Sequence, residues 1–144
     1  MSYDLIVWPV DRALTTAEAI AEVEHFGGAF QFGLGHDKRL DAFVDAMAER
    51  YPGLRKDEEH RPFEFDVMRK HVFIGVPDSG ATQIVEVVAQ AAWSVGVAVF
   101  DPQRELVALP APYGEGPMGL DGIDAHVAPT EAQSTSATSD QPKT

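Results

Sequence analysis

The stretch HVFIGVPDSGATQIVEVVAQAAWSVGVAVF, residues 71–100, decides the fold predicted for this chain. HVFIGV (71–76) is a short apolar run of the kind that forms a strand. From about residue 79 to 95 apolar residues recur at helical spacing, and Gly96 is suited to end that helix. The predicted buried face of the helix consists of Ile84, Val87, Val88, Ala91 and Val95. VAVF (97–100) is a second strand, and the two strands should run parallel with a right-handed crossover if they share a sheet.

A hairpin is predicted on each side of this unit. FEFDV (63–67) alternates apolar and acidic residues, which is typical of a half-exposed strand, and a short polar link joins it to residues 71–76. After residue 100, Asp101 and Pro102 are the residue types that begin a type I turn. ELVAL (105–109) then returns as the last strand.

The N-terminal part adds one strand and two helices. YDLIVW (3–8) is almost continuously apolar, as in a strand covered on both faces. Thr15 and Glu18 have the spacing of a capping box, which predicts a helix to about Phe26. Asp37 is a good N-cap for a further helix that ends at Pro52-Gly53. The apolar residues of this helix share one face: Leu40, Phe43, Val44, Met47 and Tyr51.

The predicted order is strand, helix, helix, strand, strand, helix, strand, strand. We therefore expect an α/β (α+β) fold with a single mixed β-sheet of about five strands and helices mainly on one face. Residues 1–111 form one globular domain in this prediction. From about residue 112, Pro, Gly, Ser and Thr replace large apolar residues, so 112–144 is expected to be a flexible, largely disordered acidic tail. Met118, Leu120 and Ile123 are the tail residues expected to dock loosely on the domain.

The charge of the chain restricts its partners. Against 11 Lys and Arg stand 23 Asp and Glu, a net charge of −12. Nucleic acid and anionic lipid bind basic surfaces, so we expect neither nucleic acid nor a membrane as partner. A basic protein partner is favoured, since long-range attraction would speed its encounter with this chain. The sequence has no cysteine and no apolar run of about 18 residues, and MSYDLIVW lacks the features of a secretory signal, so we expect a cytoplasmic protein.

Two loops supply candidate partner-binding residues. The loop GGAFQFGLGHD (27–37) is glycine-rich, yet it joins two helices and lacks the Gly-Lys-Ser/Thr of a phosphate-binding loop. Its Phe30 and Phe32 could form an aromatic contact surface, although folding back onto the core is the alternative. Acidic residues gather in the loop DEEH (57–60). The predicted partner-binding residues are thus Phe30, Phe32, Asp57, Glu58 and Glu59.

An alternative ligand site is predicted at Asp78, Ser79 and Asp101. These residues follow the strands at 71–76 and 97–100, and ligands bind at the carboxyl ends of parallel strands. Ser79 lacks the two flanking glycines of a nucleophile elbow, so Asp78 or Ser79 is expected to act as N-cap of the following helix. Asp101 is expected to act mainly as a turn former.

No catalytic residue, metal or cofactor is predicted. Glu22 and His25 make one E-x-x-H on a helix, whereas a di-iron centre needs two such motifs and two further glutamates. The absence of cysteine excludes thiolate zinc sites and iron–sulfur clusters.

SYDLIVW (2–8) and VAVFDPQ (97–103) together carry a resemblance. They resemble a group of small, mostly uncharacterised actinobacterial proteins that open with (S/T)YDL-x-VW and end the fold with V-x-FDPQ. The resemblance covers most of residues 2–109 and implies a common α/β fold. It supplies no catalytic residues, and it implies a toxin-neutralising or immunity-type role.

Three classes of function remain open. We expect a non-enzymatic protein-interaction module, of the immunity type, that binds a basic toxin or enzyme. The alternative is a small enzyme or small-molecule binder with its site at the carboxyl ends of the parallel strands. The third class is a self-associating domain.

Overall fold

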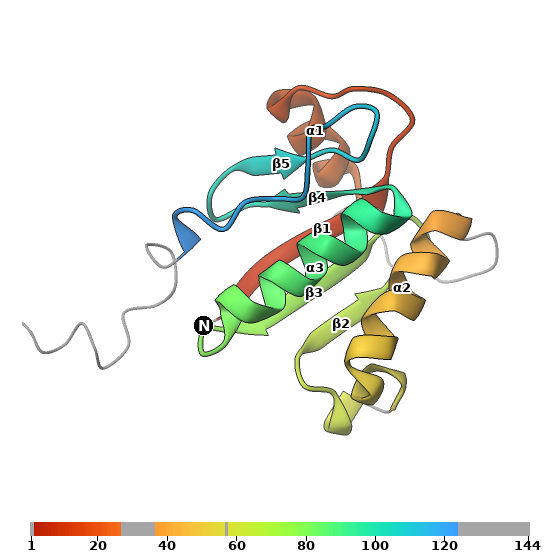
Figure 1. Ribbon diagram of the computed structural model, residues 1–144, viewed down its shortest axis with the longest axis vertical. Helices are drawn as coiled ribbons and strands as arrows, with labels where there is room; N and C mark the ends of the chain where they lie inside the picture. Colours follow the sequence, from red (N-terminus) through yellow and green to blue (C-terminus); the bar gives the residue numbers. More distant parts are fainter. Residues whose placement is uncertain (1, 27–36, 57, 124–144) are drawn as a thin grey trace, which may run out of the picture.

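The computed structural model describes residues 2–26, 37–56 and 58–123, with only the backbone described for Glu58. Within these residues the chain forms one five-stranded sheet and three α-helices, which confirms the predicted α/β (α+β) fold (Figure 1). The strands are β1 (Ser2–Pro9), β2 (Glu64–Val67), β3 (Val72–Pro77), β4 (Val97–Asp101) and β5 (Leu106–Ala108). The helices are α1 (Thr16–Phe26), α2 (Lys38–Arg50) and α3 (Ala81–Val95), with short 3-10 helices η1 (Pro52–Arg55) and η2 (Glu58–His60).

The strand order in the sheet is β2-β3-β1-β4-β5, and neighbouring strands all run antiparallel. We expected a mixed sheet because the chain joins β3 to β4 through α3. The two strands do run parallel to each other, since both are antiparallel to β1. They are not neighbours, however, because β1 lies between them. Both predicted hairpins, β2–β3 and β4–β5, are confirmed.

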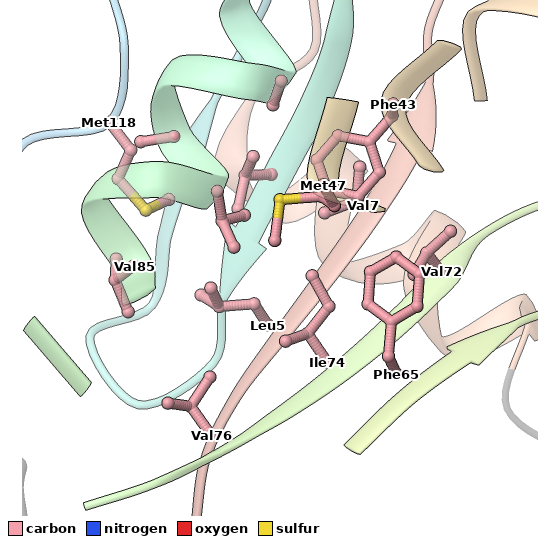
Figure 2. Close-up of a cluster of buried hydrophobic side chains, with 14 of the residues drawn as sticks. Leu5, Val7, Phe43, Met47, Phe65, Val72, Ile74, Val76, Val85 and Met118 are labelled. Carbon is pink, nitrogen blue, oxygen red and sulfur yellow. The ribbon is translucent and has the colours of Figure 1, made fainter. Parts of the chain in front are cut away.

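Successive side chains of β1 point to opposite faces of the sheet, and helices pack on both faces. Tyr3, Leu5 and Val7 are buried on the face covered by α2 and α3. There Leu5 and Val7 meet the apolar side chains of β2 and β3 (Figure 2). Ile6 and Trp8 point to the other face and pack with α1 over β4 and β5. Two of the three described helices therefore share one face, as expected.

The helix ends test the capping predictions. The capping box of α1 is confirmed, since the Thr15 amide donates to Glu18 Oε1 at 2.9 Å and the Glu18 amide donates to Thr15 Oγ1 at 3.1 Å. Asp37 caps α2 by accepting from the Arg39 amide at 2.8 Å. The N-cap prediction for α3 was wrong. Gly80, at φ 85°, takes that position without a side-chain hydrogen bond, because β3 continues to Pro77 and the chain needs a left-handed residue to enter the helix.

The buried face of α3 is wider than predicted. Of the predicted residues, Val88 is fully buried, whereas Ile84, Val87, Ala91 and Val95 are partly buried and pack at the side. The other fully buried residues of the helix are Ala81, Val85, Ala89 and Ala92. The helix contacts α2 as well as the sheet, so two neighbouring stripes of its surface are covered.

The described fold continues beyond the boundary that the composition predicts at residue 111. Met118 and Ile123 are 7% and 1% exposed and belong to the core cluster, and Leu120 packs against it. Residues 124–144 lie outside the described residues. None of the described helices combines the length and apolar character needed to cross a membrane.

Candidate binding surface

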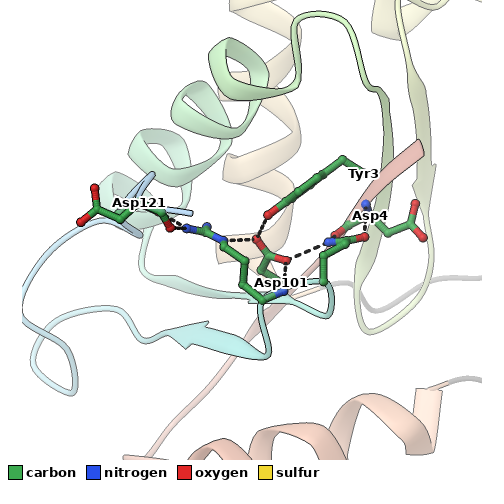
Figure 3. Close-up of polar contacts among 7 residues, drawn as sticks. Tyr3, Asp4, Asp101 and Asp121 are labelled. Carbon is green, nitrogen blue, oxygen red and sulfur yellow. Dashed lines mark hydrogen bonds and ion pairs between the residues drawn. The ribbon is translucent and has the colours of Figure 1, made fainter. Parts of the chain in front are cut away.

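Asp101 is the only fully buried charged or polar residue among the described part of the chain, at 0% exposed. Its Oδ2 accepts hydrogen bonds from the Tyr3 hydroxyl and, at 2.7 Å, from Arg104 Nε (Figure 3). Its Oδ1 accepts from Gln103 Nε2 at 2.7 Å and from the Arg104 amide at 3.1 Å. Burial, reinforced by the Asp101 carboxylate, raises the pKa of the Tyr3 hydroxyl far above its ordinary value.

The neighbours of Asp101 join three distant parts of the chain. The Gln103 side chain accepts from the Asp4 amide at 2.7 Å and donates to the Asp4 carbonyl at 2.8 Å. Arg104 Nη1 donates to the carbonyls of Gly119 and Asp121 at 2.9 and 2.7 Å (Figure 3). The network thus holds the start of β1, the end of β4 and residues 119–121 together.

This network also joins the segments SYDLIVW (2–8) and VAVFDPQ (97–103). SYDLIVW and VAVFDPQ lie against each other, because Tyr3 bonds to Asp101 and Asp4 bonds to Gln103. From the sequence we expected Asp101 to act within its own turn, and it does so through the Arg104 amide. We missed Tyr3, Gln103 and Arg104 as its partners.

The alternative ligand residues lie at one edge of the sheet, as predicted, but they do not form one site. Asp78 is half-buried, Ser79 is exposed, and Asp101 has no exposed surface. The N-terminal end of β1 lies between the ends of β3 and β4, which separates Asp78 and Ser79 from Asp101. None of the three residues lines any of the three cavities described below.

Most of the predicted partner-binding side chains lie outside the described residues. Phe30, Phe32 and Asp57 lie outside the described residues, as does the side chain of Glu58. Glu59 is exposed in η2. Among the described residues, no three His, Asp or Glu side chains are grouped in a way that could hold a metal ion.

A row of paired residues crosses the part of the sheet that α1 leaves uncovered. Ile6 pairs with Phe73, and Phe73 pairs with Asp66. Residues paired directly across strands point to the same face. Ile6 packs at the margin of the apolar cluster that α1 forms over β4 and β5. No described residue of β2 or β3 belongs to that cluster. All three side chains are consequently only partly buried, on the α1 face of the sheet.

The next row on this face is acidic at both ends. Asp4 pairs with Gly75, and Gly75 pairs with Glu64. A Cβ at Gly75 would lie 2.8 Å from Glu64 Oε1, so the Glu64 carboxylate lies over this glycine, towards β1. We call Asp4, Ile6, Glu64, Asp66 and Phe73 the acidic sheet face.

The acidic sheet face is negatively charged and lies beside a hollow at the edge of the sheet. Its two rows contain three carboxylates and no Lys or Arg. The Asp66 carboxylate has no hydrogen-bond or ion-pair partner among the described residues. Along the outer edge of β2, a hollow of about 480 Å³ is lined by Arg61 and residues 63–66. Arg61 Nη1 donates to the Phe65 carbonyl at 3.0 Å, which occupies one acceptor of this edge strand.

Two further cavities lie elsewhere on the molecule. One of about 640 Å³ lies beside Trp8 and the end of α1. The other, of about 560 Å³, lies between β5, the start of α1 and residues 113–119. Comparison of the chain with protein-family models, with curated proteins and with solved structures gave no match.

Proposed function

We propose that this protein is a non-enzymatic interaction module that binds a basic partner protein through the acidic sheet face. The observation on which the proposal rests is the convergence of Asp4, Glu64 and Asp66 around two partly exposed apolar side chains, Ile6 and Phe73. The three carboxylates come from β1 and β2, which lie on either side of β3 at a spacing of about 4.8 Å between neighbouring strands. Such an arrangement suits a partner that presents Lys or Arg around an apolar contact.

The overall charge supports the same proposal. At a net charge of −12, the molecule attracts a basic protein over a distance of about one Debye length, roughly 8–10 Å at physiological salt. The local carboxylates then orient that partner on the sheet, and burial of Phe73 and Ile6 holds it. The proposal includes the immunity-type role and the cytoplasmic location expected from the sequence. A toxin or enzyme as the partner follows from the resemblance of SYDLIVW and VAVFDPQ.

The proposal can be tested by isolating the partner and measuring its association. Wild-type protein and the double variant Glu64→Gln/Asp66→Asn are used to capture proteins from a cell extract at low salt. Glu24→Gln/Glu86→Gln is the matched control, because it removes two exposed carboxylates from α1 and α3 and changes the net charge equally. The binding of each captured protein is then measured with purified components.

We expect a basic protein that binds wild type and control alike. Its association rate with Glu64→Gln/Asp66→Asn should be about tenfold lower and less dependent on salt. An equal decrease of the association rate in both double variants would mean that net charge alone drives binding. A captured partner that does not distinguish the face variant from the control would overturn the proposed site.

A further inference from the structure

We propose that the cavity beside Trp8 is a second binding site, independent of the acidic sheet face, which takes a small aromatic anion. This cavity has a volume of about 640 Å³ and lies at the end of the sheet where α1 finishes. Phe26 and Asp37, which flank residues 27–36 in the chain, both line it. Arg69 and Lys70, from the link between β2 and β3, line it as well.

Aromatic rings form part of the cavity wall and are held in place. The Trp8 indole Nε1 donates to Glu22 Oε1 at 3.0 Å, which sets the orientation of the ring. Phe26 lies edge-on to Trp8 at 6.2 Å and stacks on His71, with ring centroids 4.7 Å apart. Trp8 is only 2% exposed, so a planar ligand would contact mainly the partly exposed Phe26 ring, which Trp8 and His71 hold in place.

The acidic side chains of the cavity are engaged with neighbours. Glu18 accepts from the Thr15 amide and from Arg12 Nη1, and the Thr15 amide is the main cause of its lowered pKa. Glu22 accepts from Trp8 and lies 3.7 Å from Arg12 Nη2.

Asp37 is engaged in the same way, by Arg39. Arg39 Nε and Nη2 donate to the two oxygens of Asp37 at 3.0 and 2.9 Å, and these bonds lower the pKa of the Asp37 carboxyl. Each carboxylate that lines the cavity thus has an arginine partner, although Glu18 and Glu22 share Arg12, and Asp37 shares Arg39 with Asp11.

Of the three Lys and Arg side chains that line the cavity, only Arg12 is paired with a described residue. Arg12 is paired with Glu18 and Glu22. Arg69 and Lys70 are exposed, and neither has a hydrogen-bond or ion-pair partner among the residues that the structure describes. In a chain with 11 Lys and Arg against 23 Asp and Glu, two unpaired cations beside one aromatic cavity favour an anionic ligand there. Aromatic carboxylates and nucleotides share this chemistry, which combines a planar ring with a carboxylate or phosphate.

The test compares two anionic probes with their neutral analogues. Indole-3-acetate is paired with indole-3-acetamide, and adenosine 5′-monophosphate with adenosine. Binding is measured by calorimetry and by NMR of the indole N–H groups. The chain has only two tryptophans, so the Trp93→Phe variant assigns the Trp8 signal. Trp93 lies in α3, on the opposite face of the sheet, and reports non-specific effects.

We expect at least one anionic probe to shift the Trp8 signal and to bind at least tenfold more tightly than its neutral analogue. Arg69→Gln/Lys70→Gln should remove this preference, whereas Arg50→Gln/Lys56→Gln, which neutralises two exposed cations outside the cavity, should retain it. The probe that binds identifies the ligand class. No binding by either anion at about millimolar concentration, equal binding of the neutral analogues, or equal loss in both double variants would overturn the proposal. The melting temperature of each variant shows that it is folded.

Discussion

Replacing Asp101 with asparagine should lower the free energy of unfolding by about 3–4 kcal/mol, because the Arg104 guanidinium then lies buried without its carboxylate. The Asp101 and Arg104 side chains are 0% and 4% exposed, with 2.7 Å between Oδ2 and Nε. Removing one partner of a buried pair typically costs about 3–5 kcal/mol. We expect the lower part of that range, since Arg104 Nη1 keeps the carbonyls of Gly119 and Asp121 as acceptors.

The hydrogen bonds lead to the same estimate. Each oxygen of Asp101 accepts two donors, one pair being Tyr3 Oη with Arg104 Nε and the other Gln103 Nε2 with the Arg104 amide. Whichever way an asparagine amide turns, its NH₂ group faces two of these donors. If Asp101 acted only as a turn former, its replacement would lower the free energy of unfolding by about 1 kcal/mol.

Asp45→Asn is the matched control. The Asp45–Arg55 pair also has an N–O distance of 2.7 Å, but its side chains are 70% and 61% exposed. An exposed pair contributes little, so we expect a loss of about 0.5 kcal/mol or less. Urea denaturation followed by tryptophan fluorescence measures both variants at low and high salt. A loss of about 1 kcal/mol or less for Asp101→Asn, or a loss that disappears at high salt, would refute the account of a buried ion pair.

Three further predictions concern pH and backbone conformation. Burial and Asp101 raise the pKa of Tyr3 above its ordinary value of about 10, so the stability due to its protonated hydroxyl is present below pH 10 and is lost as the pH rises further. An absorbance titration should show Tyr3 ionising only as the protein unfolds, and full ionisation of all three tyrosines in the folded state would contradict this. Burial lowers the pKa of His71 below 6.5, so the protein should lose stability as the pH falls below about 6.5 and through the folded-state pKa. The melting temperatures of wild type and His71→Gln are compared between about pH 7.5 and 5. If the two curves run parallel, His71 makes no contribution to the pH dependence of stability. Gly96 ends α3 at φ 87°, so Gly96→Ala should lower the free energy of unfolding in urea by about 1 kcal/mol. Gly116 has open space around it and no left-handed φ, so Gly116→Ala should change the free energy of unfolding by less than about 0.5 kcal/mol.

The elements themselves follow from patterns within short windows. Alternation at Phe63, Phe65 and Val67, the capping box of Thr15 and Glu18, and the glycine at 96 each act over a few residues, and each prediction is confirmed. The N-cap of α3 could not be found in this way. Asp78, Ser79 and Gly80 all suit a turn, and the end of β3 decides which of them begins the helix.

The candidate sites depend on strand order, which local patterns do not contain. The acidic sheet face joins residues 4, 64 and 66 only because β3 lies between β1 and β2. The cavity beside Trp8 likewise depends on the contact of α1 with the start of β3, where Phe26 stacks on His71. Alternation shows that a strand has two faces but not which strand or helix meets each of them.

The sequence by itself determined which segments are helices and strands, the two hairpins and the acidic character of the protein, because these depend on residue type and on neighbours close in the chain. Only the tertiary structure decided that β1 separates β3 from β4 and that Tyr3 reaches Asp101. Tyr3 and Asp101 are 98 positions apart, and they meet because burial of both sheet faces selects one strand order from several that satisfy the same local patterns.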